Sequence, residues 1–90
     1  MLERQVRLVN PLGLHARAAA RLVRLAAGFE SEVTLFRSDT GIRADAKSIL
    51  ELLRLAAAFD SNLTIRVEGV DEKEAVTDVV TLFLDGFGEI

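Results

Sequence analysis

The spacing of the apolar residues changes along the chain between two values, and this change limits the folds that the chain can adopt. Apolar and polar residues alternate in three stretches, at residues 4–9, 32–36 and 62–68. The last stretch is the clearest, because Leu63, Ile65 and Val67 all point to one side. Alternation of this kind is typical of a β-strand with one buried face. A fourth, short strand is predicted to open at Ile42, after a turn at residues 38–41, and to pair with the strand before it.

Between these stretches the apolar residues are three and four positions apart, which predicts helices. The buried stripe of the first helix is expected to contain Ala16, Ala19, Ala20, Val23, Ala26 and Ala27. Gly28 is expected to end this helix. The second helix is expected to begin at Ser48, where Glu51 completes a capping box.

A third helix is expected to begin at Asp71, with Glu74 in its first turn. Its buried stripe is predicted to be Ala75, Val76, Val79, Leu82 and Phe83. Residues 85–90 contain two glycines, and we expect this tail to be frayed.

The resulting order of elements is β-α-β-β-α-β-α, in a single domain at residues 1–90. We predict an α+β fold in which one four-stranded antiparallel sheet is covered on one face by three helices, because this arrangement buries every apolar face. The other face of the sheet, with Thr34, Thr64 and Arg66, is expected to meet water.

Composition excludes several classes of function. The formal net charge is −3, and the only aromatic residues are five phenylalanines. A nucleic-acid partner is therefore not expected. One histidine without any cysteine cannot form an ordinary zinc site, and no glycine-rich phosphate loop is present. We expect no metal and no cofactor. No apolar run is long enough for a signal peptide or a membrane span, so the cytoplasm is the expected location.

His15, the only histidine, stands where a loop gives way to the first helix. The start of a helix favours anions, because its free N–H groups point outward and the helix dipole is positive there. A neutral imidazole at this place can act as a nucleophile toward phosphorus, while Arg17 and the N–H groups of Ala16 and Arg17 hold the phosphate oxygens. From the residues alone, a histidine that merely ends a loop stays the more common alternative.

Two further groups of residues surround this position. Arg21 and Arg24 follow Arg17 along one side of the helix and form a basic patch suited to an acidic partner. The second helix is apolar around most of its circumference. Only one side of such a helix can face the core. The apolar side chains on its other sides are either exposed, as in a docking surface, or covered by loops.

The motifs resemble those of a known family. Gly13-Leu14-His15-Ala16-Arg17, followed by Ala19-Ala20 and Val23, resembles the active-centre motif of the HPr family. These proteins are the histidine-containing phosphocarriers of the bacterial phosphoenolpyruvate-dependent sugar phosphotransferase system. Lys47-Ser48-Ile49 resembles the regulatory motif of the family, and Gly69-Val70-Asp71-Glu72 resembles its entry into the last helix. The likeness covers nearly the whole chain, and the family has an open-faced β-sandwich fold.

The resemblance implies a role for each matching residue. His15 would accept a phosphoryl group from phosphorylated enzyme I and pass it to enzyme IIA domains, and Arg17 would steady the phosphate. The partner-binding surface would contain Arg21, Arg24, Ile49, Leu50 and Leu53. Such a carrier is a covalent relay without turnover of its own.

Ser48 matches the serine that HPr kinase/phosphorylase modifies in many members of the family. A serine that caps a helix needs no such explanation, so both readings stay open. A phosphate at Ser48 would add charge to the docking surface and so hinder enzyme I.

The chain departs from the family at Ala18, where proline is usual. Alanine loosens the first helical turn and adds an N–H donor. Two alternatives stay beside the sugar relay, and Ala18 favours the first of them. One is a regulatory or docking module of the same fold, and the other is a carrier in a related nitrogen or dihydroxyacetone kinase relay.

Overall fold

The computed structural model describes all residues 1–90 and contains one sheet and three α-helices. The elements in chain order are β1 (Leu2–Arg7), α1 (Ala16–Ala27), β2 (Glu32–Arg37), β3 (Arg43–Asp45), α2 (Ile49–Arg54), β4 (Asn62–Glu68), α3 (Glu72–Leu84) and a 3₁₀ turn η1 (Gly86–Gly88). The predicted order β-α-β-β-α-β-α is confirmed, with η1 added at its end.

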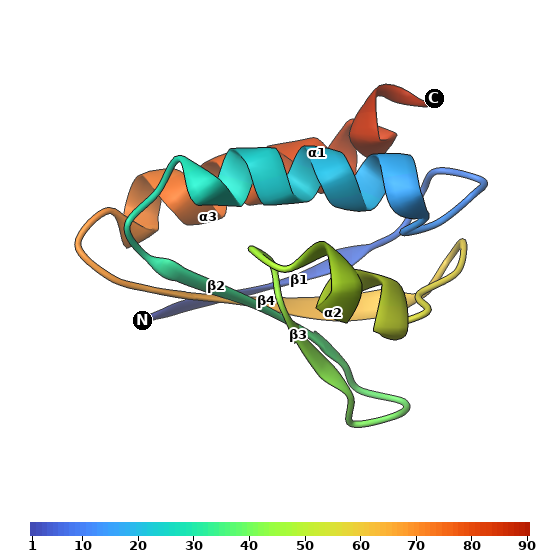
Figure 1. Cartoon of the computed structure of the whole chain (residues 1–90), viewed down its shortest axis with the longest axis horizontal. Coiled ribbons are helices and arrows are strands. Elements are labelled where there is room, and N and C mark those ends of the chain that lie inside the picture. The colour runs from blue at the N-terminus through green and yellow to red at the C-terminus, as the bar shows by residue number, and fades with distance from the viewer.

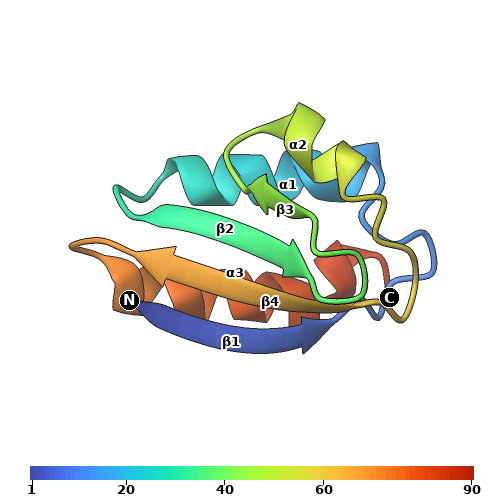
Figure 2. The same ribbon diagram turned by 90° about the horizontal axis from the view of Figure 1, so that it is seen from below.

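The four strands form one antiparallel sheet in the order β1-β4-β2-β3. Strand β4 lies between β1 and β2, so that Leu63 is opposite Val6 and Ile65 is opposite Leu35. All three helices lie on one side of this sheet (Figure 1). The other side is uncovered, as the view in Figure 2 shows. The predicted open-faced α+β architecture is therefore confirmed.

The core lies between the sheet and the helices. The inward residues of β2 and β4 are at most 1% exposed, and they are Val33, Leu35, Leu63, Ile65 and Val67. Helix α3 buries Ala75, Val76, Val79 and Phe83 against them, while Leu82 is partly buried. Burial of apolar side chains at about 25 cal/mol per Å² is the main force that holds helices to a sheet of this kind.

The buried stripe of α1 differs from the predicted one. The structure buries Ala18, Ala19, Leu22 and Ala26 and leaves Ala16 and Ala27 exposed. Six of the twelve residues of α1 are alanines, distributed around the helix. Alanine positions alone therefore do not define which side faces the core, whereas Leu22 does.

The starts of the other two helices also differ in detail from the prediction. Ser48 caps α2 as expected, but the Glu51 carboxylate accepts a hydrogen bond from the N–H of Asp45 and not from that of Ser48. Asp71 occupies the N-cap position of α3 without a side-chain capping bond. Its carboxylate instead accepts the N–H groups of Glu30 and Ser31 at 2.8 and 2.9 Å, and so ties two loops together.

The expectation of a frayed tail is wrong. Residues 86–88 form η1, in which Phe87 is fully buried and packs edge-to-face on Phe83 with 4.9 Å between ring centroids. The glycines on either side of Phe87 both have positive φ, which lets the chain fold back on itself. The C-terminal segment consequently lies beside the first turn of α1 (Figure 1).

Candidate phosphoryl-acceptor site

The loop before α1 is held rigidly against the loop that follows α2. Gly13 has φ +64°, and a Cβ at this position would lie 2.6 Å from the carbonyl oxygen of Ala57. Glycine is therefore required by both its backbone conformation and this close approach. The next N–H, of Leu14, donates to the same carbonyl oxygen at 2.9 Å. These contacts fix the position of His15.

His15 is the N-cap residue of α1, as predicted. Its backbone is extended, and its carbonyl accepts the N–H of Ala19 at 2.8 Å. The imidazole makes no capping bond, and the first turn contains no acidic residue. The first N–H groups of α1 therefore lack side-chain acceptors, and the positive end of the helix dipole is uncompensated. This helix start is arranged to receive an anion.

The imidazole contacts the C-terminal segment. Nε2 of His15 lies 2.6 Å from Oε2 of Glu89, and Nδ2 of Asn10 donates to Oε1 of the same carboxylate at 2.9 Å. The hydrogen bond from Asn10 is the main cause that lowers the pKa of Glu89, and the hydrogen bond from His15 contributes in the same direction. Glu89 is therefore ionised at neutral pH. The other ring nitrogen, Nδ1, has no hydrogen-bond partner in the protein.

The predicted arginines divide into two groups. Arg17 and Arg24 are exposed and make no ion pair. Arg21 is half-buried, and its guanidinium donates to the carbonyl of Phe87. Arg17 and Arg21 together line a depression of about 300 Å³ with Pro11, Leu12, Gly88 and Glu89. The structure therefore places Arg17 and Arg21 beside Glu89 and gives Arg21 a structural contact as well.

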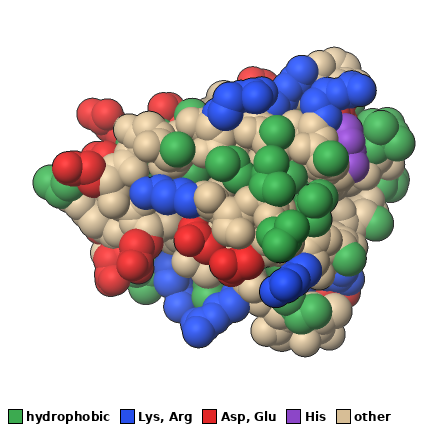
Figure 3. Space-filling view, viewed as in Figure 1, with side chains coloured by type: hydrophobic (Ala, Val, Ile, Leu, Met, Phe, Trp, Pro, Cys, Tyr) green, Lys and Arg blue, Asp and Glu red, His purple; other side chains and the backbone are tan.

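Helix α2 carries the exposed apolar side chains that the sequence left unassigned. Ile49, Leu50 and Leu53 are 41%, 63% and 39% exposed, whereas Leu52 and Leu55 are buried. We call these three exposed residues the α2 patch. In Figure 3, hydrophobic side chains gather below a row of basic side chains, and His15 lies at one end of both. The structure thus brings the α2 patch, the arginines of α1 and His15 onto one face.

Ser48 lies at the edge of this face. Its hydroxyl accepts the N–H of Glu51 at 3.3 Å and is half-buried. The structure therefore gives Ser48 a capping role.

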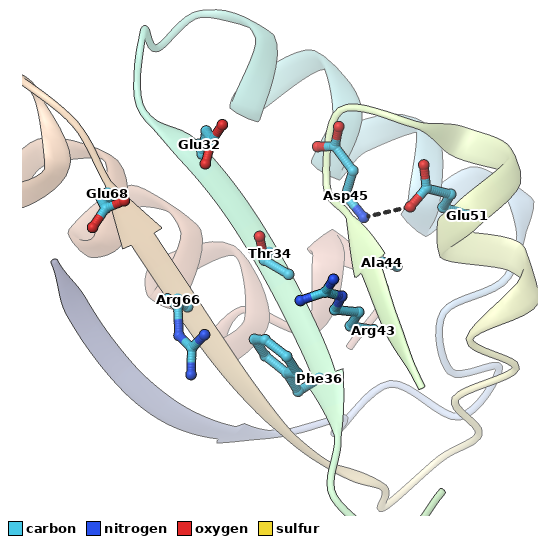
Figure 4. Close-up of a pocket in the computed structure, with 9 residues that line it drawn as sticks. All are labelled: Glu32, Thr34, Phe36, Arg43, Ala44, Asp45, Glu51, Arg66 and Glu68. Carbon is cyan, nitrogen blue, oxygen red and sulfur yellow. Dashed lines mark hydrogen bonds between the residues drawn. The ribbon is translucent and has the colours of Figure 1, made fainter. Parts of the chain in front are cut away.

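A second hollow, of about 410 Å³, lies on the uncovered face of the sheet, and its lining comes from β2, β3, β4 and α2 and does not include His15 (Figure 4). Arg66 in this hollow already pairs with Glu3 at 2.7 Å and stacks over the ring of Phe36. The backbone N–H of Asp45 donates to the carboxylate of Glu51 at 3.1 Å (Figure 4). The hollow is the solvated face of the sheet, as predicted for Thr34 and Arg66.

Asn10 and Glu89 were missed by reasoning from the sequence. Asn10 lies in the loop between β1 and α1, and Glu89 lies in the segment that we expected to be frayed. One signal was available: Phe87 is a large apolar residue in that segment, and burial of a phenylalanine side chain is favourable.

Comparison with known proteins supports the family resemblance. The family model described as the phosphorylation site of the HPr component of the phosphotransferase system matches residues 2–85. The chain is 44% identical over 89 residues to the phosphocarrier protein HPr of Cupriavidus necator, with 99% of this chain and 98% of the relative covered. It is 40% identical over 88 residues to the phosphocarrier protein NPr of Escherichia coli, with 98% and 97% covered.

Solved structures agree. The crystal structure of HPr-C-His from Thermoanaerobacter tengcongensis superimposes with a TM-score of 0.94 at 33% identity, over 100% of this chain and 99% of the other. No helix in the protein has the length and apolar character needed to span a membrane. The chain belongs to the HPr family of phosphocarrier proteins of the phosphotransferase system.

Proposed function

We propose that His15 accepts a phosphoryl group from phosphorylated enzyme I and passes it to enzyme IIA domains during sugar uptake. One observation carries this assignment: the only histidine of a phosphocarrier chain stands at an uncapped helix start with one ring nitrogen unoccupied. Because Nε2 faces the Glu89 carboxylate, Nδ1 is the nitrogen whose lone pair is available.

The proposed transfer of the phosphoryl group needs no cofactor, because one bond to phosphorus forms as another breaks. The Nδ1 lone pair forms the new bond to phosphorus while the bond between phosphorus and the donor breaks, and its electron pair stays with the donor. The proton on Nε2 is retained, so the ring carries the positive charge until the phosphoryl group leaves. Transfer to an enzyme IIA domain is the same step in reverse. The chain returns to its starting state and acts as a relay without turnover of its own.

The charge of the phosphoryl group is stabilised by groups that are already in position. The free N–H groups of Ala16, Arg17 and Ala18 provide donors at the positive end of α1. Arg17 is exposed and unpaired, so its guanidinium is free to bind phosphate oxygens. Charge-assisted hydrogen bonds of this kind contribute about 1.5–3 kcal/mol each.

Enzyme I and the enzyme IIA domains would bind in turn to the face that contains the α2 patch, Arg21 and Arg24. Apolar area at its centre and cations beside it suit partners with an acidic, partly apolar surface. A surface shared by successive partners needs fast release and so modest affinity. Such a relay would work in the cytoplasm, and neither nucleic acid nor membrane insertion is part of this proposal.

The decisive experiment is the intact mass of the protein after incubation with phosphoenolpyruvate and active enzyme I. We expect an acid-labile gain of one phosphoryl group, because a phosphoramidate hydrolyses in acid. His15→Ala should abolish the gain and keep the native circular dichroism, since the imidazole contributes no capping bond. An unmodified wild-type protein beside an active enzyme I would favour a docking or regulatory module instead.

A nitrogen-linked relay is the second candidate. Relatives named NPr match at 40–42% identity, close to the 44% of the HPr from Cupriavidus necator. Parallel reactions with the enzyme I of the sugar system and with its nitrogen-linked counterpart would distinguish the two, because the cognate donor should phosphorylate His15 faster. No feature of the structure favours a dihydroxyacetone kinase relay.

Ser48 is proposed as a second, regulatory phosphorylation site for an HPr kinase/phosphorylase. Its support is the motif and its place beside Ile49 and Leu50, where a phosphate would add negative charge to the proposed docking face. The same phosphate would lie at the start of α2, so the helix would tolerate it.

A further inference from the structure

The carboxylate of Glu89 contacts the ring nitrogen of His15 that does not react. We propose that Glu89 is a positioning residue that keeps the imidazole proton on Nε2, and that Asn10 and Arg21 hold Glu89 in place for this purpose. The inference rests on the proposed role of His15 and adds a residue to it, since it assigns the state of the ring before transfer.

The direction of the hydrogen bond between Glu89 and His15 is fixed by chemistry. An ionised carboxylate only accepts hydrogen bonds, and Asn10 already donates to its Oε1. At 2.6 Å from Oε2, the Nε2 atom must therefore carry the proton. In the neutral imidazole, a proton on Nε2 leaves the Nδ1 lone pair free.

Asn10 cannot reverse this arrangement. It is fully buried, and its Nδ2 also donates to the carbonyl of Gly13 at 2.7 Å. Because both of its neighbours are acceptors, the amide must present nitrogen to Glu89. Its own Oδ1 is buried without a partner, and an orphaned acceptor of this kind typically costs about 1–3 kcal/mol. The amide is kept in this orientation at a local energetic cost.

The C-terminal segment is anchored just before this contact. Phe87 is buried and has φ +57°, a left-handed conformation that is strained for phenylalanine. Arg21 donates to the Phe87 carbonyl, and a Cβ at Gly88 would lie 2.8 Å from the Arg21 guanidinium. Gly88 has φ +74°, a conformation that favours glycine. Burial of Phe87 and the hydrogen bond from Arg21 to its carbonyl together hold the backbone that leads into Glu89.

The carboxylate serves the transfer in two ways. Before the transfer it selects the tautomer in which Nδ1 is nucleophilic. During the transfer it faces the positive charge that develops on the ring. The charge of Arg17 also acts on Glu89 and contributes to the lowering of its pKa, after Asn10 and His15.

Substitution of Glu89 by glutamine gives a sharp test. The amide of Gln must present its oxygen to Nδ2 of Asn10, which is a donor, and its NH₂ group would then face Nε2. This NH₂ requires an unprotonated Nε2 and moves the proton to Nδ1, which blocks the nucleophile. Glu89→Ala removes the contact and leaves the ring free to populate both tautomers. Glu74→Gln, an exposed glutamate without a hydrogen bond, is the matched control for the lost charge.

The tautomer is read from the ¹⁵N shifts of the neutral His15 ring in the unphosphorylated protein. The rate is measured as the initial rate of phosphorylation by enzyme I. We expect Nε2–H in the wild type and in Glu74→Gln, and Nδ1–H in Glu89→Gln. The initial rate should fall in the order Glu74→Gln, Glu89→Ala, Glu89→Gln, with the last at least about tenfold below the control.

The opposite order of the two Glu89 variants would overturn the inference, because a merely structural role is better served by isosteric Gln than by Ala. An unchanged tautomer in Glu89→Gln, or an unchanged rate, would overturn it as well. A wild type that accepts no phosphoryl group would instead refute the proposed function, while the ¹⁵N shifts would still report on Glu89.

Discussion

The starts of α1 and α2 are both proposed phosphorylation sites, yet their local chemistry is opposite. At α1, the side chain of the N-cap residue His15 turns away from the helix, and no acidic residue lies in the first turn. At α2, the N-cap residue Ser48 binds the N–H of Glu51, which is itself an acidic residue of the first turn. One helix start is open to an anion, and the other is already satisfied by its own side chains.

This difference shows that the start of a helix can either bind a phosphoryl group during its transfer or stabilise the helix itself. Unsatisfied N–H groups cost little when they are exposed to water, and they give a phosphoryl group a site that needs no rearrangement. A capped start stabilises a short helix, such as the six residues of α2, which has little stability of its own. We therefore expect substitutions at α1 to change the transfer rate and those at α2 to change mainly stability or docking.

Among substitutions that keep His15, the largest effect is expected for Arg17→Ala. Loss of a charge-assisted contact worth about 2 kcal/mol should slow phosphorylation by enzyme I roughly 30-fold, because Arg17 is unpaired and free to hold the phosphate. The initial rate at limiting enzyme I is the measurement. Arg43→Ala, which removes an equally exposed cation from the far face of the sheet, is the control. Equal rates for the two variants would show that the start of α1 works without Arg17.

Ser48→Asp should slow the same reaction by roughly tenfold, since it places a charge beside the α2 patch and one tenfold step is about 1.4 kcal/mol. Ser38→Asp, in the exposed turn between β2 and β3, controls for the added charge. The effect should appear mainly in the enzyme I concentration that is needed for half-maximal rate. An unchanged rate would remove Ser48 from the docking face.

Ser48→Ala tests the closed helix start by itself. Removal of the capping oxygen should lower the free energy of unfolding by about 1 kcal/mol. For a domain of this size the melting temperature should fall by about 4–8 °C. The phosphorylation rate should stay near that of the wild type. Ser38→Ala should change neither quantity, and a similar loss of stability in both variants would contradict the capping role.

The third helix start predicts a dependence on pH. The pKa of Asp71 is lowered, chiefly by the Ser31 hydroxyl and then by the N–H of Glu30. Because this pKa is lower in the folded state, the contribution to stability is complete above the ordinary carboxyl pKa and is lost as pH falls through the lowered value. In the Asp71→Asn variant, the free energy of unfolding should therefore fall less steeply than in the wild type as the pH is lowered. Urea titrations at a series of pH values measure this. An equally steep fall in Asp71→Asn would show that other titrating groups cause the loss of stability in acid.

Reasoning from the sequence found most of the fold. The alternation in β2 and β4 was sufficient to predict these strands and their buried faces. Every second residue is strongly apolar, so only one face can be buried. The bounds were less certain: β1 covers Leu2–Arg7, where residues 4–9 were expected, and β3 begins at Arg43 and not at Ile42. Strand ends depend on pairing with partners that are distant in the chain.

For the site, the sequence identified the residues of the α1 start and of the α2 patch but not their exposure. Leu50 and Leu52 are chemically alike, yet one is 63% exposed and the other is buried. Only the packing of α2 on its neighbours distinguishes them. The same applies to Arg21, which local spacing grouped with Arg17 and which the structure ties to Phe87.

The sequence by itself determined the order of the elements, the fold class and the residue proposed to accept the phosphoryl group, because periodicity and helix-start signals are local. Only the tertiary structure decided which nitrogen of His15 is free. Glu89 is 74 residues away from His15, and the contact exists because buried Phe87 folds the C-terminal segment back onto α1. The energy of that contact comes from burial and from hydrogen bonds between segments that no local pattern connects.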